Sequence, residues 1–492
     1  MDKEKMDSIM KKISTRHKIT RRQFLKTAAG TAAGAALLSV PWQGSDLFAA
    51  KAKKKSTKGE KPVRIAFLGA MNFPLSVGGW RSVQIGVDEI NAAGGILGRP
   101  VELVGPYDDQ GRPEDAIKMY EKAVWTDKVD FVLDGMLDDS SAACMKRVAE
   151  TNVITLGGWV STVACSDKVW QDYEKYKNWF MGVANDWGLV IGIRDYVQNF
   201  LVKKLGWKSV VIFREDLIWT QGCAEYCYEE FPKIGMQVKG DVVFPIDTVD
   251  YAPLFDKCVK SKADGIICFL AAVATVPLAQ YMKLEVPMVI AGVNTDAGMY
   301  EFYEDSGGSL GACAQWGCFA GQQSQKTRAF MEKYWNKFKD RPRLPEHCGY
   351  DGYTNLIALK DAIERAKTFD SNAIIKELER TYEEFYYDWP WFPGGWFGME
   401  RPESSKAVPE RYRRAAYKGS WEGLNAPVAP HVWGVPEMVR WGQWQAPSQV
   451  KPIGDTWNLD WQAKNFPKKY GRFVCIWPQE FADGEFQLPP WM

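Results

Sequence analysis

Asp88-Glu89-Ile90-Asn91-Ala92-Ala93-Gly94-Gly95-Ile96-Leu97-Gly98-Arg99-Pro100-Val101 is the stretch that decides the fold of this 492-residue chain. The apolar residues Val83, Val87 and Ile90 recur at helical spacing before it. The helix that they predict ends at Gly94-Gly95, where glycine suits a left-handed C-cap, and a tight turn then leads into a strand from Val101. The stretch therefore predicts a helix, a turn and a second strand, as in a βα repeat.

The same alternation continues outward from this stretch in both directions. Continuous apolar runs predict strands buried on both faces, and segments of ten or more residues with helical spacing separate them. Strands are expected at 63–69, 101–104, 129–133, 153–156, 210–213, 238–243, 266–269 and 288–291. Helices are expected at 113–125, 141–150, 187–205, 251–260, 276–282, 327–340 and 350–366, with one more ending at 231. Two βα arrays of similar length in tandem predict an α/β fold of two doubly wound parallel-sheet lobes.

The first 50 residues predict a cleavable export signal. Thr20-Arg21-Arg22-Gln23-Phe24-Leu25-Lys26 precedes a small, mildly apolar run from Ala28 to Val40, and Ala49-Ala50 offers a small-residue cleavage site. The run of about thirteen residues is too short to cross the roughly 30 Å of a bilayer core. The segment resembles a twin-arginine signal, which implies export of the folded protein by the twin-arginine machinery to the periplasm. The alternative is a basic tail followed by an amphipathic helix.

Charge gives no indication of a nucleic-acid partner. Residues 1–50 carry nine Lys or Arg against four Asp or Glu, which leaves 53 basic and 57 acidic residues, a net charge of −4. Such a balance gives no electrostatic reason to expect nucleic acid or anionic lipid as a partner. Residues 51–61 form a Lys-rich tether, and the 440 or so residues of the mature chain predict two or three domains.

Ten cysteines in an exported chain permit disulfides without requiring any. Buried thiols with one or two structural bridges are expected; Cys223 and Cys227 lie four apart on a predicted helix, and Cys313 and Cys318 flank a short apolar segment. With three histidines and no CxxC motif, no metal site and no cofactor are expected. From residue 386 onward the chain holds eleven of its 22 tryptophans, which are expected to pack a loop-rich extension onto the lobes. The alternative is an aromatic surface that binds carbohydrate or a partner.

Several motifs, taken in order, resemble the type I periplasmic solute-binding proteins of ABC importers, in the family that binds the branched-chain amino acids Leu, Ile and Val. These motifs are Asp88–Val101, Asp108-Asp109-Gln110, Gly135 with Ser140-Ser141, Gly349–Tyr353, Val474–Pro478 and Pro489–Trp491. The resemblance implies two lobes joined by three hinge crossovers that close on a ligand. We place the crossovers near Met181–Ala184, Trp316–Ala320 and Pro393–Phe397.

The resemblance also suggests a division of the chain. Residues 1–50 are the signal and 51–61 the tether, 62–182 form lobe 1 and 183–317 form lobe 2. Residues 318–392 return to lobe 1. Residues 393–492 contain a Trp-rich segment, partly an insertion, together with one crossover and the closing strand of the family.

Ligands of open α/β sheets bind beyond the carboxyl ends of the strands, which places the first candidate residues in the loops of lobe 1. Phe73 or Trp80 is a candidate to form a wall of the cleft. The alternative is that these side chains pack at the start of a helix. The family's serine that holds a ligand carboxylate, helped by helix N-terminal amides, matches Ser140 or Ser141, where plain N-capping is the alternative. The loop with Trp159 and Val160 has an indole in the place of a threonine, which suggests a pocket for a flatter or more apolar ligand or a packing role. Tyr350 is a further candidate.

Lobe 2 contributes four candidates. Trp219 matches a tyrosine that stacks on the ligand in the family, and Ala272 lies where backbone can approach closely. Asn294 stands where amino-acid binders place a carboxylate for the ligand's ammonium group. Asp296, two residues on, either holds a cation or caps a loop. This departure leaves an amino acid, an amide and an aromatic acid as candidate ligands.

These observations predict an extracytoplasmic solute-binding protein that delivers a small organic ligand to an ABC permease of the inner membrane. A ligand-sensing domain of the same fold without a transporter is the alternative. An exported redox or hydrolytic enzyme is the third possibility, but the chain lacks G-x-G-x-x-G after a strand, a Walker loop, a G-x-S-x-G elbow and a metal-spaced histidine cluster. We therefore predict a binding protein and not an enzyme.

Overall fold

The computed structural model describes residues 61–182, 193–194, 196–308, 314–316, 325–343, 347–384, 441–477, 479 and 482–492. The expected signal, most of the tether, and the crossover at 393–397 lie outside these residues, as do parts of the other two crossovers. None of the helices in the described part of the chain combines the length and apolar character needed to cross a bilayer.

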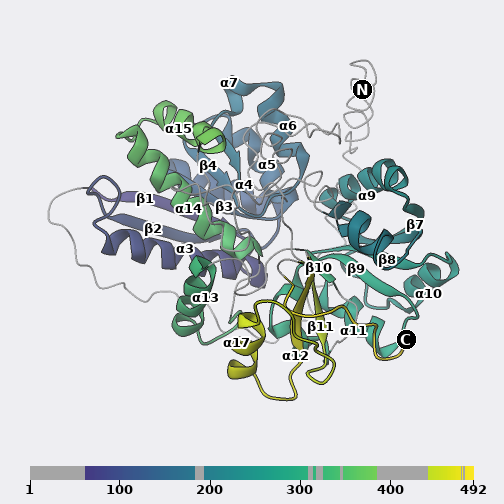
Figure 1. Ribbon diagram of the computed structural model, residues 1–492. Coiled ribbons are helices and arrows are strands. Elements are labelled where there is room, and N and C mark those ends of the chain that lie inside the picture. The colour runs from purple at the N-terminus through teal and green to yellow at the C-terminus, as the bar shows by residue number, and fades with distance from the viewer. Residues whose placement is uncertain are drawn as a thin grey trace. The chain divides into compact units, whose positions relative to one another are not determined.

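The first sheet has five parallel strands in the order β2-β1-β3-β4-β5 (Figure 1). The strands are β1 Val63–Gly69, β2 Val101–Asp108, β3 Phe131–Gly135, β4 Ile154–Gly157 and β5 Trp179–Met181. Every residue of β3 and β4 is buried, as the continuous apolar runs predict for strands covered on both faces. All five carboxyl ends therefore lie along one edge of the sheet.

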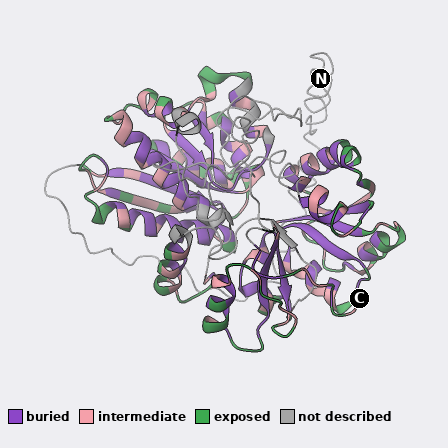
Figure 2. Ribbon diagram, in the orientation of Figure 1, coloured by how far each residue is buried: buried purple, intermediate pink, exposed green. Residues whose placement is uncertain are grey.

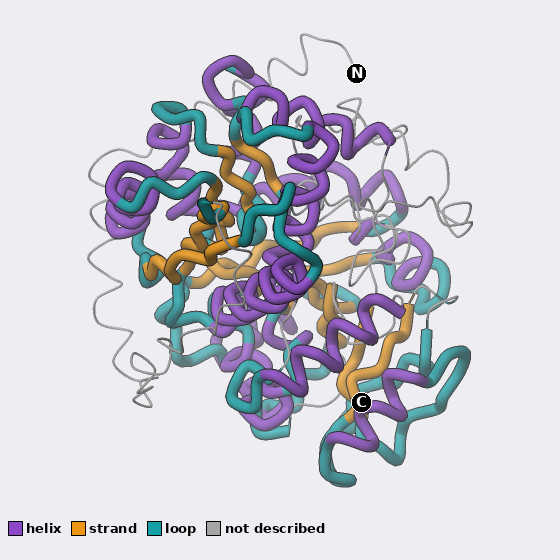
Figure 3. The backbone as a smooth tube through the Cα atoms, turned by 90° about the vertical axis from the view of Figure 1, so that its left-hand side faces the viewer, coloured by secondary structure: helices purple, strands orange, loops and turns teal. Residues whose placement is uncertain are grey.

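Helices cover both faces of this sheet, as the view turned by 90° shows (Figure 3). On one face α3 packs against α14, and on the other α4 packs against α5. These helices are α3 Pro74–Ala92, α14 His347–Ala366, α4 Pro113–Glu121 and α5 Asp138–Val148. The π-helix η2 Lys122–Thr126 extends α4, α6 Val163–Gln171 and α7 Tyr173–Tyr176 follow β4, and α15 Ser371–Glu384 packs on α14.

Helix α14 approaches α3 very closely because both helices carry glycine at the contact. A Cβ atom on Gly352 would lie 3.0 Å from the carbonyl oxygen of Gly79, and one on Gly86 would lie 2.8 Å from the Leu356 side chain. Lys333 and Lys337 of α13 (Gln325–Lys337) form ion pairs with Glu89 and Asp88 of α3. Helices that follow residue 324 in the chain thus pack on a helix that precedes residue 93.

The stretch at 88–101 folds as a helix end followed by a hairpin-like turn. Gly94 and Gly95 have φ of 104° and 83°, and the Gly95 N–H donates to the Ile90 carbonyl at 2.8 Å. Ile96 and Arg99 exchange two backbone hydrogen bonds across Leu97 and Gly98, both with positive φ. The Asn91 amide then donates to the Val101 carbonyl and accepts from its N–H, which fixes the start of β2 against the end of α3.

The second sheet has four parallel strands in the order β7-β6-β8-β9. They are β6 Ser209–Glu215, β7 Gln237–Phe244, β8 Gly265–Leu270 and β9 Val289–Asn294. The helical segments between and before them are η3 Val197–Val202, α9 Ile218–Glu230, η4 Phe231–Ile234, α10 Ala252–Lys260 and α11 Thr275–Lys283. Strands β6, β8 and β9 are almost wholly buried, whereas the edge strand β7 alternates between exposed and covered residues (Figure 2).

The described C-terminal residues form a three-stranded antiparallel sheet, β10-β11-β12, and the helix α17. These elements are β10 Ala314–Trp316, β11 Trp441–Gln445, β12 Arg472–Trp477 and α17 Trp457–Asn465. Trp444 is fully buried, donates its indole N–H to the Ala297 carbonyl and packs edge to face on Tyr300. Trp461 donates to Glu332 and contacts Trp335. These rings bind the segment to η5 (Asp296–Gly298), α12 (Glu301–Asp305) and α13, the packing role expected from the sequence.

Seven cysteines are described with their side chains, and all are buried: Cys144, Cys165, Cys223, Cys227, Cys258, Cys268 and Cys475. The expectation of buried thiols is met at these positions, and Cys144, Cys165, Cys227, Cys258 and Cys268 are free of any bridge. Cys313 and Cys318 lie outside the described residues.

Gly95 and Gly98 offer a matched test of the turn, because their φ values of 83° and 84° are nearly equal. A Cβ on Gly95 would lie 2.0 Å from the Arg99 carbonyl oxygen, whereas no atom of the described residues lies within 4 Å of one on Gly98. We expect Gly98→Ala to lower the free energy of unfolding by about 1 kcal/mol through backbone strain alone. Gly95→Ala should lower it by about 3 kcal/mol, since the clash adds to the strain. Urea unfolding checks this; equal losses would contradict the turn.

Candidate functional site

The carboxyl edge of the first sheet contains a small pocket between the ends of β1, β3 and β4 and the helices α3 and α14. Its volume is about 270 Å³, including space open to solvent. The lining residues are Phe67, Leu75, Ser76, Gly79, Leu133, Asp134, Gly135, Leu156, Gly158, Trp159, Gly352 and Asn355. The walls are mostly apolar, and three polar side chains, those of Ser76, Asp134 and Asn355, interrupt them.

Asp134 is the buried acid of this pocket, at the end of β3, with 1% of its surface exposed. Its carboxylate accepts hydrogen bonds from the Met136 N–H at 2.8 Å and from the Ser141 hydroxyl at 2.9 Å. Burial raises the pKa of Asp134 to about 7, although these two hydrogen bonds oppose the rise. Asp134 can therefore exchange a proton near neutral pH.

Two further acids lie at the same edge. Asp109, fully buried, accepts a hydrogen bond from the Gly111 N–H at 3.2 Å, and burial raises its pKa to about 6. Asp138, in the first turn of α5, accepts from the N–H groups of Ser161 and Thr162 at 2.7 and 2.5 Å. The edge thus carries acidic groups that hold neighbouring loops together.

The predicted residues of lobe 1 fall into two groups. Ser140 and Ser141 are fully buried in the first turn of α5, where Ser141 donates to Asp134. Phe73, half-buried, packs edge to face on Trp159 at 6.3 Å, and Leu75 and Leu137 complete this small apolar cluster. The structure therefore brings Phe73 and Trp159 together beside the pocket.

The remaining candidates of lobe 1 are Val160, Trp80 and Tyr350. Val160 is fully buried next to Trp159. Trp80 is 5% exposed and packs on Phe67 at 5.7 Å, two helical turns into α3, which fits the packing alternative. Tyr350 belongs to α14, and its side chain lies outside the described residues.

The carboxyl edge of the second sheet is organised by Glu215, a residue that the sequence reading did not single out. Glu215 ends β6 and is fully buried. Its carboxylate accepts hydrogen bonds from the N–H groups of Ala271, Ala272 and Val273 at 2.9 to 3.3 Å. Burial raises the pKa of Glu215 to about 7, against the opposing effect of these donors. The loop after β8 is thus folded around the side chain of β6.

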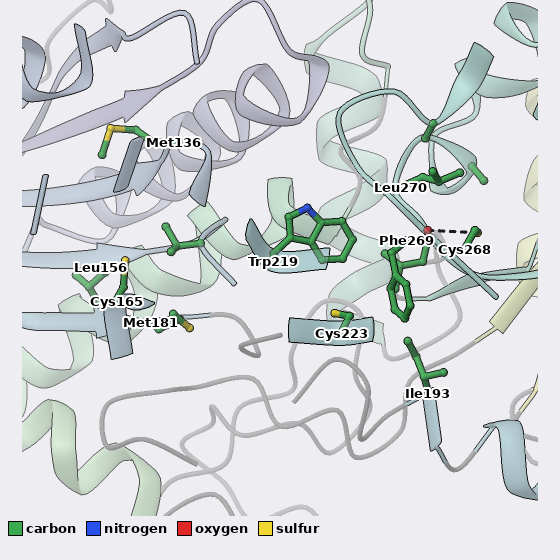
Figure 4. Packing of buried hydrophobic residues seen from close by; sticks show 14 of the residues in the cluster. Met136, Leu156, Cys165, Met181, Ile193, Trp219, Cys223, Cys268, Phe269 and Leu270 are labelled. Carbon is green, nitrogen blue, oxygen red and sulfur yellow. Dashed lines mark hydrogen bonds between the residues drawn. The ribbon is translucent and has the colours of Figure 1, made fainter. Parts of the chain in front are cut away.

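Two of the predicted residues of lobe 2, Trp219 and Ala272, lie next to this carboxylate. Trp219 is 4% exposed on the first turn of α9, and its ring meets Phe269 edge to face at 6.1 Å (Figure 4). Ala272 donates its N–H to Glu215. Asn294, fully buried at the end of β9, accepts from the Ala297 N–H at 2.9 Å.

Asp296 acts as a cap in this structure. Its carboxylate accepts from the N–H of Thr275 at 2.9 Å and from the Thr275 hydroxyl at 2.6 Å, at the start of α11. This is the capping alternative considered for Asp296; a role in holding a ligand cation stays a prediction.

Sequence reasoning missed Asp134, Asn355 and Glu215. A single acid at the end of an apolar strand was the available signal for Asp134 and Glu215, since Asp134 directly follows Phe131–Leu133 and Glu215 comes two residues after Phe213. No comparable signal existed for Asn355, because its place in the pocket depends on how α14 packs. Among the described residues, no group of three His, Cys, Asp or Glu side chains is arranged to hold a metal ion.

Comparison with known proteins gives two family matches. A model described as periplasmic binding protein matches residues 62–400, and one described as a twin-arginine translocation pathway signal sequence matches residues 18–37.

Solved structures share the fold at low sequence identity. A branched-chain amino-acid transporter substrate-binding protein of Streptococcus pneumoniae, in complex with isoleucine, is 18% identical, with 78% of this chain and 97% of that one covered and a TM-score of 0.58. A putative branched-chain amino-acid ABC transporter protein of Silicibacter pomeroyi is 18% identical, with 88% and 100% covered and a TM-score of 0.63. A solute-binding protein of Rhodopseudomonas palustris, in complex with 3,4-dihydroxybenzoic acid, is 16% identical, with 65% and 85% covered and a TM-score of 0.54. At these identities the likeness shows the fold alone.

Glu215→Gln tests whether this carboxylate holds the loop after β8. One of the two Gln terminal atoms is an NH₂ group, which would face backbone donors where an oxygen now accepts. At pH 8 we expect a loss of about 2 kcal/mol in the free energy of unfolding. The exposed Glu229→Gln on α9 is the control and should change it by less than about 0.5 kcal/mol. Equal urea midpoints for the two variants would contradict this role of Glu215.

Asp134→Asn tests the buried acid of the first sheet. The pKa of Asp134 is about 7 in the folded protein, against an ordinary value of 3.8. Between about pH 4 and 7 the folded protein therefore keeps a proton on Asp134 that the unfolded chain has released. The stability that this group contributes is therefore complete below pH 4 and is lost as the pH rises through 7. The free energy of unfolding of the wild-type protein should fall between pH 4 and pH 8. In Asp134→Asn we expect this fall to be smaller, by up to about 4 kcal/mol.

The exposed Asp256→Asn serves as the control and should leave this fall unchanged. An Asp134→Asn protein whose stability declines as steeply as that of the wild type would show that Asp134 already ionises at its ordinary pKa.

Proposed function

The chain belongs to the periplasmic binding protein family, and on that premise we propose that it captures a small organic solute and presents it to an ABC-type permease of the inner membrane. Its twin-arginine signal makes it a periplasmic protein that the twin-arginine machinery exports. Capture and release need only different affinities of two forms of the protein for the ligand, without bond chemistry. The family and fold are those of binding proteins, so the chain is not an enzyme.

The observation that carries this proposal is the arrangement of the strand ends. In the first sheet, Trp159 and Phe73 stand beside a pocket that contains Asp134 and Asn355. In the second sheet, Trp219, Ala272 and Asn294 gather around the loops after β6, β8 and β9. Carboxyl ends of parallel strands are where open α/β sheets bind ligands, and each of the two edges offers an aromatic ring next to polar groups.

The ligand that we propose is an amino acid, an amide or a small aromatic acid. Two of the similar structures contain isoleucine and 3,4-dihydroxybenzoic acid, which supports this range. Trp159 and Trp219 supply flat apolar surfaces suited to stacking. A ligand-sensing role without transport uses the same site, and a permease encoded beside this chain would separate the two.

Calorimetric titration of the purified mature protein against amino acids, amides and small aromatic acids tests the proposal. A ligand at 100 times its dissociation constant should stabilise the fold by about 2.7 kcal/mol, which a melting experiment detects. Conversion of a bound compound into a product would overturn the binding role in favour of an enzyme.

Trp219→Ala gives a residue-level prediction. Loss of the stacking surface should weaken ligand affinity at least tenfold, about 1.4 kcal/mol, with an unchanged fold by circular dichroism. Trp125→Ala is the matched control, because Trp125 is 44% exposed on η2 and lies at neither strand edge. Wild-type affinity in Trp219→Ala would remove Trp219 from the site.

A further inference from the structure

We infer that the ligand enters the pocket of the first sheet with a nitrogen group that donates hydrogen bonds, an amine above all, and that Asp134 and Asn355 receive it. The inference rests on the proposed function and narrows its ligand class. It reverses the orientation that the family resemblance suggested, in which Ser140 or Ser141 holds a carboxylate.

Asn355 is the first observation that points to a ligand. Its side chain is 1% exposed and lines the pocket with Asp134, and neither its amide nitrogen nor its oxygen has a hydrogen-bond partner among the described residues. A buried amide left in this state costs free energy, so native proteins rarely keep one without a reason. A ligand that both donates and accepts hydrogen bonds would supply the missing partners.

The surrounding backbone is built to make room for Asn355. A Cβ atom on Gly182 would lie 1.9 Å from the Asn355 oxygen, and one on Gly158 would lie 3.0 Å from the Asn355 nitrogen. Any other residue at Gly182 would displace the amide. Two loops from different strands therefore leave space for one polar side chain that has no partner within the described protein.

The charges at this edge disfavour a carboxylate. None of the described lining residues is basic, and Asp134 is itself a lining residue. Of the two serines expected to hold a ligand carboxylate, Ser141 already donates to Asp134, and the hydroxyl of Ser140 lies beside Asp109. The first turn of α5 carries Asp138 and Asp139, which offset the positive end of the helix dipole. An incoming anion would meet like charge, and an ammonium group would meet opposite charge.

The titratable groups that act on Asp134 strengthen this contrast. They are Asp109 directly after β2, Asp138 in the first turn of α5, Tyr120 on α4, Cys144 on α5 and Cys165 on α6. Asp351, also fully buried, lies one turn before Asn355 on α14. Each of these groups is neutral when protonated and negative when deprotonated, so a ligand cation would be the only positive charge among them.

The size of the pocket decides how much of the ligand it takes. Its enclosed part has room for about one water molecule, which is close to the size of an ammonium group. It therefore accommodates the terminal nitrogen group of a ligand, and Phe67, Leu75 and Trp159 line it with apolar surface.

Ligands that share a skeleton and differ at one end test this inference. Benzylamine, benzamide and benzoate, with isobutylamine, isobutyramide and isobutyrate, are titrated calorimetrically into the mature protein at pH 6 and pH 8. We expect each amine to bind at least tenfold more tightly than the matching carboxylate, with the amide between them. Amine affinity should rise from pH 6 to pH 8, because Asp134 ionises in that range.

Two variants identify the receiving residues. Asp134→Asn should weaken amine binding at least tenfold and abolish its rise with pH. Asn355→Leu, which replaces the amide by an apolar side chain of similar size, should weaken binding of amines and amides while the melting temperature stays equal or rises. A merely structural Asn355 would instead give a lower melting temperature and unchanged affinity. Asp256→Asn is the exposed control.

The outcomes separate this inference from the proposed function. Tightest binding of a carboxylate, with no loss in Asp134→Asn, would overturn the inference and leave a solute-binding protein. Absence of binding by all six compounds would overturn the inference for these ligand classes and count against the proposed function as well.

Discussion

The structure depends on one constraint: strands buried on both faces end together at one edge, and the backbone groups of the loops that leave this edge must find partners there. Two acids meet this requirement at central strands. Asp134, the residue before the last of β3, accepts from the Met136 N–H and the Ser141 hydroxyl. Glu215, the last residue of β6, accepts from three backbone N–H groups of the loop after β8. The loops that carry the candidate ligand residues are therefore shaped by buried carboxylates of the protein itself.

The same constraint explains which strands and site residues could be predicted from the sequence and which could not. The runs that became β1, β6, β8 and β9 were predicted because each is a continuous apolar stretch, and β1 was predicted with its observed bounds, Val63–Gly69. The strand β5, Trp179–Met181, was missed because three residues show no periodicity, and α15 was missed although its apolar residues recur at helical spacing. Trp159 and Phe73 were found from their positions after strands, whereas the pocket position of Asn355 follows only from the close packing of α14 on α3.

Burial of the thiols agrees with export of the folded chain. The seven cysteines described with side chains are buried, and burial raises the pKa of several of them, which keeps the unreactive thiol form. A protein that folds before it crosses the membrane has these groups enclosed before it reaches an oxidising compartment. Cys223 and Cys227, one helical turn apart on α9, illustrate this, because both are fully buried.

The family fold leaves the chemistry of the ligand to the strand-end loops, so a shared fold at 15 to 20% identity permits different ligands. Here the Ser141 hydroxyl donates to Asp134, and the indole of Trp159 lines the pocket. Both features act in the same direction, since one engages a donor that an anion would need and the other provides an apolar wall. An edge with buried acids and no lining base can still use the family's closing motion, but it must select its ligand by the positive or hydrogen-bond-donating end of that molecule.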